Sequence, residues 1–535
     1  MTMFGGHLLS LPILLPLLAG VLLTLINERH HAVKLGINIV ATLLLLAVSV
    51  LLLREVGATD EAVTAVYRIG DWPVPIAINL VGDRLAAVMV VLVAVLAVGA
   101  LSFAAARWYR AGAHFHTLFQ LLLMGLNGAF LTGDLFNLFV FFEVLLAASY
   151  GLLLHGSGSA RVRAGLHYIA FNLAASFLFL LGVSLIYGVT GSLNMADVAA
   201  RITTVAPESR SLLEAGLALL GLAFLAKAAM WPVGFWLPTA YAVASAPAAA
   251  IFAVMSKVGI YVLLRFSALL TANGLAGFGH EWLFYGGLAT IVFGTVGVLA
   301  SQDLPRMVAF SLLVSSGTLL AMLSYDDPAV TAGAIYYLVV STLTVAALFL
   351  LCELMERGRA PEADIMAVTL EAFGDEEELE HEEEVGIAIP GTMAILSVSF
   401  ALCAILLAGM PPLSGFFAKF MLMVGMVESD AGQVGAVSPA TWVMIALLLV
   451  SGVSTMIALL RSGINRFWVP AEGGTPRVRV VEIGPVALFL GLCIVLTVLA
   501  APAMSYLEAM AASLHSPTEY IGAVLGNPGG KGAQP

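Results

Sequence analysis

Residues 135–154 read LFNLFVFFEVLLAASYGLLL, twenty residues in which Glu143 carries the only charge. An apolar run of about 20 residues is long enough to cross the roughly 30 Å hydrocarbon core of a bilayer as a helix. Glu143 stands nine residues after Asp134 and twelve before His155, the polar residues that flank the run. The stretch therefore predicts a transmembrane helix with a carboxyl group near mid-membrane. Such ionisable groups are usually functional, although a neutral, hydrogen-bonded acid that serves helix packing is the alternative.

The composition of the whole chain extends this prediction from one helix to many. Of the 535 residues, 61% are hydrophobic and 11% are charged. Soluble domains carry about 25% charged residues, so a soluble multidomain enzyme is excluded. The sequence predicts an all-α polytopic membrane protein with about 14 transmembrane helices. Their expected spans are 8–26, 33–53, 85–106, 115–131, 135–154, 166–187, 212–241, 246–270, 282–300, 307–323, 329–351, 391–427, 442–460 and 483–506.

Two of these spans are too long to cross the membrane as straight helices. The seventh and twelfth have 30 and 37 residues, or roughly 45 and 55 Å as continuous α-helices. Each contains a helix-breaking stretch, WPVGF at 231–235 and GMPPLSGF at 409–416. Broken helices near an ionisable residue, in corresponding places of two halves, are typical of ion pathways in transporters. We therefore expect two inverted five-helix repeats, spans 4–8 and 9–13, with helices 7 and 12 broken.

This arrangement divides the chain into four predicted parts. Residues 1–114 hold three N-terminal helices, 115–270 the first repeat, 281–460 the second repeat, and 461–535 the last helix and tail. The second repeat includes an acidic loop, residues 355–390, whose twelve acids and two arginines give −10 of the net charge of −11. No basic patch is left to neutralise phosphates, so no nucleic-acid partner is expected. The loop is interpreted as a solvated segment, with a cation funnel as the alternative.

Three of the five lysines lie inside apolar runs, namely Lys227, Lys257 and Lys419. Burial disfavours the charged form of an amine, whereas a nearby carboxylate favours it. A Glu143–Lys227 pair whose separation changes would therefore switch the proton affinity of the amine. A static ion pair is the alternative for Lys227, and snorkelling to the interface is the alternative for Lys419.

The remaining polar residues near the span ends are expected to be interfacial. Arg265 is interpreted as a snorkelling cation, and Asp134 and His167 as solvated or capping groups.

The distribution of basic residues predicts the orientation of the chain in the membrane. Counting Lys34 as a loop residue, the odd-numbered loops hold 13 lysines and arginines, and the even-numbered loops with the tail hold 7. The positive-inside rule then places the odd loops in the cytoplasm and both termini outside. Cys352, Cys403 and Cys493 have no paired spacing, so neither a disulfide nor a zinc site is expected.

Several of these segments together resemble one protein family. The stretch LTGDLFNLFVFFE at 131–143 resembles the fifth helix of antiporter-like membrane subunits, and FLAKAAMWPVGFWLP at 224–238 resembles the seventh. GVTGSLNMAD at 188–197 and GMPPLSGFFAK at 409–419 are similar as well. The family comprises proton-pumping membrane subunits of respiratory complex I and the large subunits of Mrp-type multisubunit sodium/proton antiporters. The acidic segment ending EEEVGIAIP at 382–390 resembles that of Mrp-type D subunits in Gram-negative bacteria.

The resemblance implies fourteen helices with inverted repeats and a proton-transfer route through Glu143, Lys227, Lys257 and Lys419. It also implies an ion-transport subunit rather than an enzyme, with no cofactor. Its partners would be other Mrp antiporter subunits, protons, and Na⁺ or another monovalent cation. The expected location is the bacterial inner membrane, with both termini on the periplasmic face.

One feature departs from the family pattern. Many relatives carry histidines in helices ten and eleven, but residues 309–317 and 336–344 contain none. Transfer from Lys257 to Lys419 would then need water held by hydroxyl groups. The candidates are Ser311, Ser315, Tyr337, Ser341 and Thr342. Hydroxyls in membrane helices also serve packing, which is the alternative role.

Two other functions stay open for this sequence. A proton-pumping subunit of a complex I-type NADH:quinone oxidoreductase or of a membrane-bound hydrogenase would use the same relay, driven by redox chemistry. A scaffold whose charges only fix helix packing predicts that Lys227→Met changes nothing in transport. Sodium coupling is expected to involve a partner subunit, because the sequence offers no clustered intramembrane carboxylates for a cation.

Overall fold

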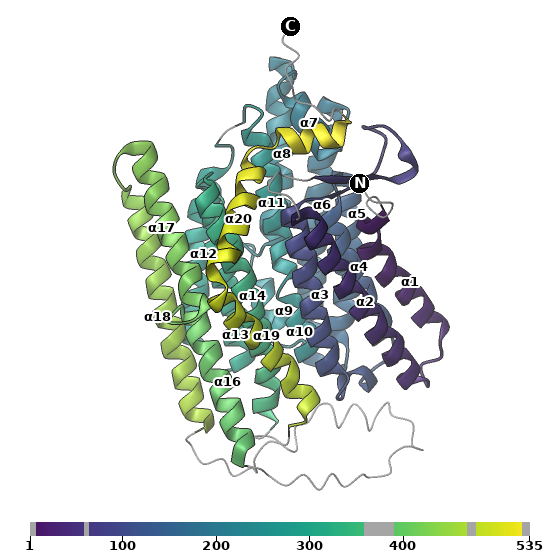
Figure 1. Ribbon diagram of the computed structural model, residues 1–535, viewed down its shortest axis with the longest axis vertical. Helices are drawn as coiled ribbons and strands as arrows, with labels where there is room; N and C mark the ends of the chain where they lie inside the picture. The colour runs from purple at the N-terminus through teal and green to yellow at the C-terminus, as the bar shows by residue number, and fades with distance from the viewer. Residues whose placement is uncertain (1–6, 58–63, 276, 358–389, 468–477, 527–535) are drawn as a thin grey trace.

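The computed structural model describes residues 7–57, 64–275, 277–357, 390–467 and 478–526, and most of them are helical. Twelve helices in these ranges are long and apolar enough to cross a membrane, and two shorter apolar helices are Leu11–Leu25 and Phe115–Leu131. Most of them stand side by side along the longest axis of the molecule (Figure 1). The predicted all-α polytopic membrane architecture is confirmed. The count of fourteen spans and their pairing as inverted repeats stay predictions.

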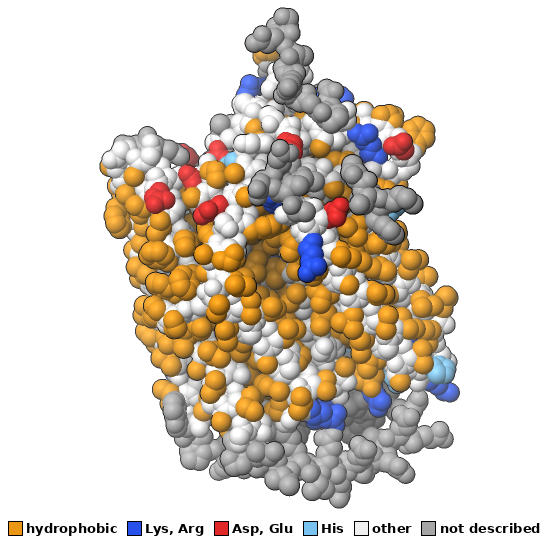
Figure 2. All heavy atoms as spheres, viewed as in Figure 1, with side chains coloured by type: hydrophobic (Ala, Val, Ile, Leu, Met, Phe, Trp, Pro, Cys, Tyr) orange, Lys and Arg blue, Asp and Glu red, His pale blue; other side chains and the backbone are white. Residues whose placement is uncertain are grey.

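The surface of the bundle is apolar where it would contact the hydrocarbon core of a membrane. On the face drawn in Figure 2, hydrophobic side chains form a broad belt around the middle, and most charged side chains gather toward the two ends. Large apolar residues such as Leu18, Trp282 and Val498 are exposed. A soluble protein rarely exposes apolar surface this extensive. Residues 358–389, which hold most of the predicted acidic loop, lie outside the described part of the chain.

The N-terminal part contains three long helices and a small hairpin. Its elements are η1 (His7–Leu9), α1 (Leu11–Leu25), α2 (His31–Gly57), β1 (Ala65–Arg68), η2 (Ile69–Asp71), β2 (Asn79–Gly82), α3 (Arg84–Ala104) and η3 (Trp108–Arg110). β1 pairs antiparallel with β2, from Ala65 opposite Gly82 to Arg68 opposite Asn79. The hairpin is a small addition to the all-α architecture, and its four-residue strands are too short to show a periodic pattern in the sequence. Together with bridges from β2 to Thr132 and from Asp134 to Asn194, it caps one end of the bundle.

The next helices form the first half of the bundle. They are α4 (Phe115–Leu131), α5 (Leu135–Leu154), α6 (Ser159–Thr190), α7 (Met195–Ile202), α8 (Pro207–Lys227), α9 (Trp236–Tyr241), α10 (Ala246–Phe252) and α11 (Met255–Thr271). α6 and α8 approach closely, because a Cβ atom on Gly182 would lie 2.7 Å from Leu220 N and 2.8 Å from Gly216 O. Small residues allow such close backbone contact in membrane helices.

The second half follows, and the last helices return across it. The elements are α12 (His280–Ala300), α13 (Leu304–Met322), α14 (Pro328–Glu356), α16 (Pro390–Ala408), α17 (Ser414–Val434), α18 (Pro439–Phe467), α19 (Val480–Val498), α20 (Ala500–His515) and α21 (Thr518–Leu525). α19 and α20 cross the face of the bundle against α14, and α19 also contacts α3 (Figure 1). Both η1 and α21 pack on β1, so the first and last described elements lie at the same end.

Both predicted helix breaks are present. The seventh span divides at 228–235 into α8 and α9, and the twelfth divides at 409–413 into α16 and α17. At the first break Pro232 follows Trp231, and at the second Gly409 adopts a left-handed φ of +75° before Pro411 and Pro412. Proline has no N–H to donate and glycine tolerates positive φ. The local sequence therefore ends each helix within the apolar region.

A third break, which the sequence did not predict, divides the eighth span. α10 ends at Phe252 and α11 begins at Met255. Here the N–H of Lys257 donates to the carbonyl of Val254 at 3.0 Å, an i→i−3 bond in place of the helical i→i−4 bond. No proline or glycine occurs between residues 249 and 258, so the sequence carries no signal for this break. Each intramembrane lysine consequently lies close to a helix end.

Two basic residues assigned to a loop or to the interface are buried instead. Lys34 lies in the first turn of α2, is 1% exposed, and pairs with Glu28 at 2.7 Å. Arg265 of α11 is 3% exposed and pairs with Asp83 at 2.7 Å. Both predictions are therefore wrong. The physical reason is that a carboxylate from another segment compensates each charge.

Other predicted features are located as follows. Cys352, Cys403 and Cys493 are free and buried, in agreement with the absence of paired spacing. The four-part division of the chain stays a prediction. Its limit between residues 460 and 461 falls inside α18, whereas the limit at 114–115 coincides with the start of α4.

Candidate functional site

Glu143 lies on α5 and is directed toward α6. It is half-buried, and its Oε1 accepts a hydrogen bond from the hydroxyl of Ser176, which is buried on α6. A hydrogen bond to a charged group contributes about 1.5–3 kcal/mol. The hydroxyl of Ser176 also lies 3.0 Å from the carbonyl of Asn172 on its own helix, so its single proton is shared between these two acceptors.

Lys227 is the last residue of α8 and is buried against α5. Its Nζ lies 4.7 Å from the centre of the Phe142 ring. A desolvated cation–π contact contributes about 2 kcal/mol, and the partial negative charge at a helix C-terminus also favours a cation. Among the described residues, no ion pair joins Lys227 with Glu143, the residue next to Phe142, and the carboxylate of Glu143 is bound by Ser176.

Asp134 and His167 are not joined to these groups. Asp134 caps α5, because its Oδ1 accepts from the N–H of Asn137 at 2.8 Å, which confirms the predicted capping role. Burial raises the pKa of Asp134 above its usual 3.8, although the N–H groups of Asn137 and Phe136 act in the opposite direction. His167 is exposed on α6 and lies 2.9 Å from the carbonyl of Arg163, as expected of a solvated residue. Asp134 thus holds the end of the helix that carries Glu143.

Lys257 is the third residue of α11, and its side chain is fully buried. Its Nζ donates to the hydroxyl of Ser315 at 3.0 Å and to that of Ser316 at 3.3 Å, both on α13. A Cβ atom on Gly259 would lie 3.0 Å from the N of Ala228, so the backbone of α11 touches the end of α8. Lys227 and Lys257 therefore lie on adjoining helix ends.

Three of the predicted hydroxyl residues continue from Lys257. The oxygens of Ser315 and Ser341 are 3.0 Å apart, which joins α13 to α14. The hydroxyl of Tyr337 also interacts with Ser315. This gives a line from the amine of Lys257 through two serine hydroxyls into α14.

The other two predicted hydroxyl residues bond within their own helices. Ser311 donates to the carbonyl of Met307 at 3.0 Å, and Thr342 donates to the carbonyl of Leu338 at 2.6 Å. Back-bonding of this kind satisfies the hydroxyl locally. Ser311 and Thr342 thus show the packing alternative rather than a contact with Lys257.

Lys419 is buried near the break between α16 and α17. Its Nζ donates to the carbonyl of Ala408, the last residue of α16, at 2.9 Å. A Cβ atom on Gly452 of α18 would lie 2.9 Å from this Nζ and 2.4 Å from the Ala408 oxygen, so only glycine leaves room for the contact. The amine is held inside and does not snorkel. Among the described side chains, no hydrogen bond connects Ser341 with Lys419.

Sequence reasoning missed four residues of this site: Phe142, Ser176, Ser316 and Gly452. Ser176 and Gly452 carry the signal of a small residue within an apolar span, which is common at helix contacts. Such residues are too frequent in this chain to single out without knowing which helices meet.

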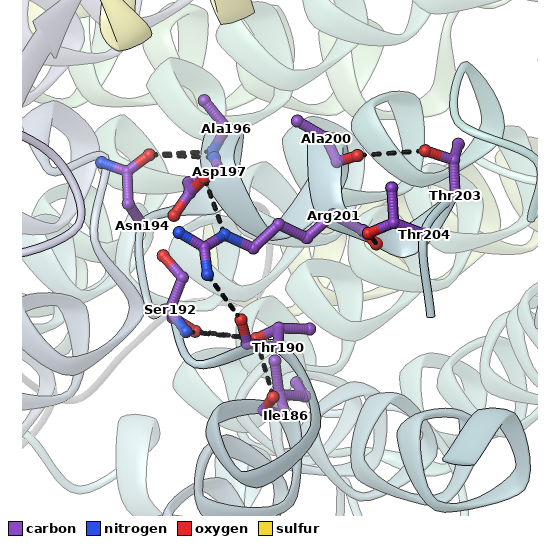
Figure 3. A network of polar contacts seen from close by, with 10 residues as sticks. All are labelled: Ile186, Thr190, Ser192, Asn194, Ala196, Asp197, Ala200, Arg201, Thr203 and Thr204. Atoms are coloured by element: carbon purple, nitrogen blue, oxygen red, sulfur yellow. Dashed lines mark hydrogen bonds and ion pairs between the residues drawn. The ribbon is translucent and has the colours of Figure 1, made fainter. Parts of the chain in front are cut away.

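The motif at 188–197 forms a polar cap at the end of α6 (Figure 3). Asn194 Oδ1 accepts from the N–H groups of Ala196 and Asp197. Arg201 donates to Asp197 Oδ1 at 3.0 Å and to the carbonyl of Thr190 at 2.9 Å. These bonds fix the turn from α6 to α7, and with it the helix that carries Ser176.

A family model described as "NADH:quinone oxidoreductase/Mrp antiporter, TM" matches residues 132–444. The match covers more than half of the chain and includes Glu143, Lys227, Lys257 and Lys419. The chain belongs to this antiporter family. The predicted resemblance is thereby confirmed.

Relatives in the antiporter family are similar along nearly their whole length. A protein of Rhizobium meliloti (strain 1021), named as the probable D subunit of a K⁺/H⁺ antiporter, is 55% identical over 534 residues, 99% of each chain. The D subunit of an Na⁺/H⁺ antiporter of Alkalihalophilus pseudofirmus (strain ATCC BAA-2126 / JCM 17055 / OF4) is 33% identical, over 97% of this chain and 99% of the other. A chain in the solved "Structure of Mrp complex from Dietzia sp. DQ12-45-1b" superimposes with a TM-score of 0.80 at 25% identity, over 98% of this chain and 100% of that one.

These antiporter relatives are named as ion-transport subunits and not as enzymes. In the described ranges, no group of three or more His, Cys, Asp or Glu side chains could hold a metal ion. The groups that the structure brings together are buried amines, a carboxylate and hydroxyls, all of which can exchange protons. The individual roles of these residues stay predictions.

Proposed function

We propose that this chain is the D-type subunit of a multisubunit monovalent cation/proton antiporter and that it carries protons through Glu143, Lys227, Lys257 and Lys419. The observation that supports the route best is the line from Lys257 through Ser315 to Ser341, which joins three helices by hydrogen bonds. A packing scaffold has no need of a buried amine bonded only to hydroxyls.

In this proposal Lys227 alternates between two surroundings. When the carboxylate of Glu143 approaches, the charge pair stabilises the ammonium form. When Glu143 is bound by Ser176, Lys227 keeps only the Phe142 ring and the helix end. The ammonium then loses its proton toward Lys257 across the contact between α8 and α11.

The second part of the route uses hydroxyls. A serine passes a proton when its oxygen accepts one from Lys257 and releases its own to the next oxygen, so that charge and atoms balance. Ser315 and Ser341 are spaced for this exchange at 3.0 Å. Water would complete the path from Ser341 to Lys419, and the proton would leave on the far side of the membrane.

The other subunits of the antiporter are the proposed partners of this chain. A monovalent cation is the proposed counter-ion, with K⁺ favoured by the name of the 55% identical relative. Its binding site is proposed to include a partner subunit. We further propose that the chain lies in the bacterial inner membrane with both termini on the periplasmic face, in line with the arginine and lysine bias of the loops.

The test expresses the complete set of antiporter subunits in a salt-sensitive host that lacks its own antiporters. Glu143→Ala and Lys227→Ala should each abolish growth at high Na⁺ or K⁺ and remove cation-dependent proton movement in membrane vesicles. Assembly of the complex is checked by purification. If both variants assemble and retain full exchange, the relay is wrong.

A matched pair of serines separates the hydroxyl route from packing. Ser315→Ala should slow exchange about tenfold, because one lost hydrogen bond to a charged group is about 1.5–3 kcal/mol. Ser311→Ala is the control, because this serine lies on the same helix and donates only to a backbone carbonyl of that helix, and it should retain the parental rate.

The redox-driven alternative predicts a different dependence. Proton movement that depends on a quinone or hydrogenase substrate and not on a cation would favour it.

A further inference from the structure

A second set of buried polar side chains lies in the N-terminal helices, apart from the proposed relay. It consists of Lys34, Asn38 and Thr42 on α2 and of His116 and Gln120 on α4, and all five are buried. We call these five residues the α2–α4 polar file. Their spacing of four residues on each helix places them along one face of it. Polar groups that are buried in membrane helices usually mark a functional path.

The file begins at the loop between α1 and α2. Lys34 Nζ donates to Glu28 Oε1 at 2.7 Å, and His114 Nδ1 lies 3.0 Å from the same oxygen. Glu28 is half-exposed and His114 is exposed, so this end meets the aqueous phase. The titratable groups that act on His116 from the surrounding elements are Lys34, Glu28, His31 and His155.

From this end, hydrogen bonds lead inward between the two helices. Asn38 Nδ2 lies 2.8 Å from His116 Nδ1. Gln120 Nε2 donates to Asn38 Oδ1 at 2.7 Å and to Thr42 Oγ1 at 3.1 Å. The eight residues from Lys34 to Thr42 correspond to about 12 Å along the helix. The file thus reaches well into the membrane.

Two atoms of the file need a further partner. His116 Nε2 and Gln120 Oε1 are buried and have no hydrogen-bond partner among the described residues. A buried polar atom without a hydrogen-bond partner destabilises the fold. Water can both donate and accept, and ordered water commonly satisfies buried polar groups that lack a protein partner. The unpaired atoms therefore indicate a hydrated file.

The far end of the file is apolar. Leu45 and Leu123 are fully buried and lie three residues beyond Thr42 and Gln120. The next polar residue on this stretch of α2 is Ser49, which donates to the carbonyl of Leu45 at 2.7 Å. The polar lining consequently ends inside the membrane rather than crossing it.

A deeper amide on α4 has a separate, structural explanation. Asn127 Nδ2 donates to the carbonyl of Pro12 at 2.9 Å. This carbonyl lacks its helical partner, because Pro16 of α1 has no N–H. Asn127 Nδ2 therefore satisfies the Pro12 carbonyl, whereas Asn127 Oδ1 is buried without a partner among the described residues.

We propose that the α2–α4 polar file is a water-filled half-channel that opens beside Glu28 and brings water and protons as far as Gln120. It lies outside the Glu143–Lys419 route and does not depend on that route. Its role is aqueous access to the N-terminal helices from the side of the α1–α2 loop.

Cysteine reactivity in the assembled complex tests this directly. Thr42→Cys and Ser49→Cys are matched, since both residues are buried hydroxyls on α2 that donate to the carbonyl four residues earlier. A thiolate attacks the reagent sulfur of a methanethiosulfonate, forming a mixed disulfide and releasing methanesulfinate, and thiolates form in water and not in apolar surroundings. With 2-aminoethyl methanethiosulfonate and peptide mapping, the thiol at position 42 should react at least about tenfold faster than the thiol at position 49. If both thiols react slowly, the five residues form a dry packing network. If both react fast, the path continues past Thr42 to position 49. Either result overturns the proposal.

A plug variant tests the direction of access. Asn38→Leu places an apolar side chain between Lys34 and Thr42, so it should slow the reaction of Thr42→Cys about tenfold. An unchanged rate contradicts entry from the Glu28 side. If Thr42→Cys does not assemble, Gln120→Cys with Leu123→Cys as its control gives the same comparison on α4. Because thiol reactivity needs no turnover, it succeeds or fails independently of the proton relay.

Discussion

At the scale of single residues, the three intramembrane lysines differ in what surrounds their charge. Lys227 has an aromatic ring and a nearby carboxylate, Lys257 has two hydroxyls, and Lys419 has a backbone carbonyl. A charged amine in a low-dielectric region depends strongly on such partners. A change of partner at one lysine therefore changes which amine of the row holds a proton most easily. We propose that Glu143 is the partner that changes, because its carboxylate binds Ser176 while the neighbouring Phe142 contacts Lys227.

Removing that competitor gives a residue-scale prediction. Ser176→Ala leaves Glu143 paired with Lys227 for longer, and we expect proton exchange by the reconstituted complex to fall about tenfold. The rate is measured from cation-driven pH change in proteoliposomes. Ser184→Ala is the control, because this serine lies on the same helix and donates only to the carbonyl of Leu180. An equal loss in both variants would assign the effect to α6 itself and contradict the role of Ser176.

The charged members of the site could be found from the chain alone, but their partners could not. Glu143 and Lys227 are conspicuous because each interrupts a long apolar run. Ser176 is 33 residues from the carboxylate that it binds, and nothing in its local sequence distinguishes it from Ser184. The same holds for the buried ion pair of Lys34, which was assigned to a loop, and for that of Arg265, which was assigned to the interface.

At the scale of elements, the positions of helix ends and the closeness of helix pairs shape the site. α8 ends at Lys227 and α11 begins beside Lys257, so the two amines lie at helix termini rather than in helix centres. The break before α11 arises without proline or glycine. α11 packs against α8 and α13 at this point, and the local sequence carries no signal for the break.

Helix contact gives the second prediction. Gly182→Ala would place a Cβ atom 2.7 Å from the backbone of α8, and overpacking of this kind costs about 1–3 kcal/mol. We expect a lower thermal midpoint of the purified complex and a slower exchange rate, because α6 carries Ser176. Gly221→Ala on α8 is the control, since a Cβ atom there meets nothing within 4 Å. Comparable losses in both variants would show that helix propensity and not contact decides the outcome.

At the scale of the whole molecule, buried ion pairs connect segments that are far apart in the chain. Arg265 of α11 bonds Asp83 at the start of α3, and its guanidinium also lies 5.2 Å from the ring centre of Tyr520 in α21. Arg357 at the end of α14 bonds Glu482 of α19 at 2.5 Å. These contacts hold the C-terminal helices to both halves of the bundle.

Breaking one of these pairs gives the third prediction. Arg265→Met leaves the carboxylate of Asp83 without its cation, and we expect a loss of about 3 kcal/mol in the stability of the complex. The double variant Asp83→Asn/Arg265→Met should recover part of this loss, because no unpaired charge stays behind. Thermal unfolding of the purified complex measures both. A double variant that is less stable than the single one would contradict the argument.

The same pair has a defined pH dependence. Burial acts to raise the pKa of Asp83, but the charge and hydrogen bond of Arg265 outweigh it and hold this pKa below the usual 3.8. A carboxyl group with a lowered pKa contributes its stability above the unfolded value and loses it as the pH falls through the folded value. The intact pair should therefore stabilise the parental complex equally at about pH 6 and about pH 8 and lose this contribution in acid, which thermal unfolding of the parental complex across this pH range measures.

Run length and the positions of proline and glycine are local properties of the chain. These properties were enough to predict that the protein is a polytopic membrane protein, where most of its helices lie, and that helices break at 228–235 and 409–413. The third break, the Ser176 and Phe142 contacts and the burial of Lys34 and Arg265 came from the folded bundle. The physical reason is that the energy of a charge in an apolar medium depends on the nearest partner in space. That partner is supplied by another helix, and helix packing brings it there.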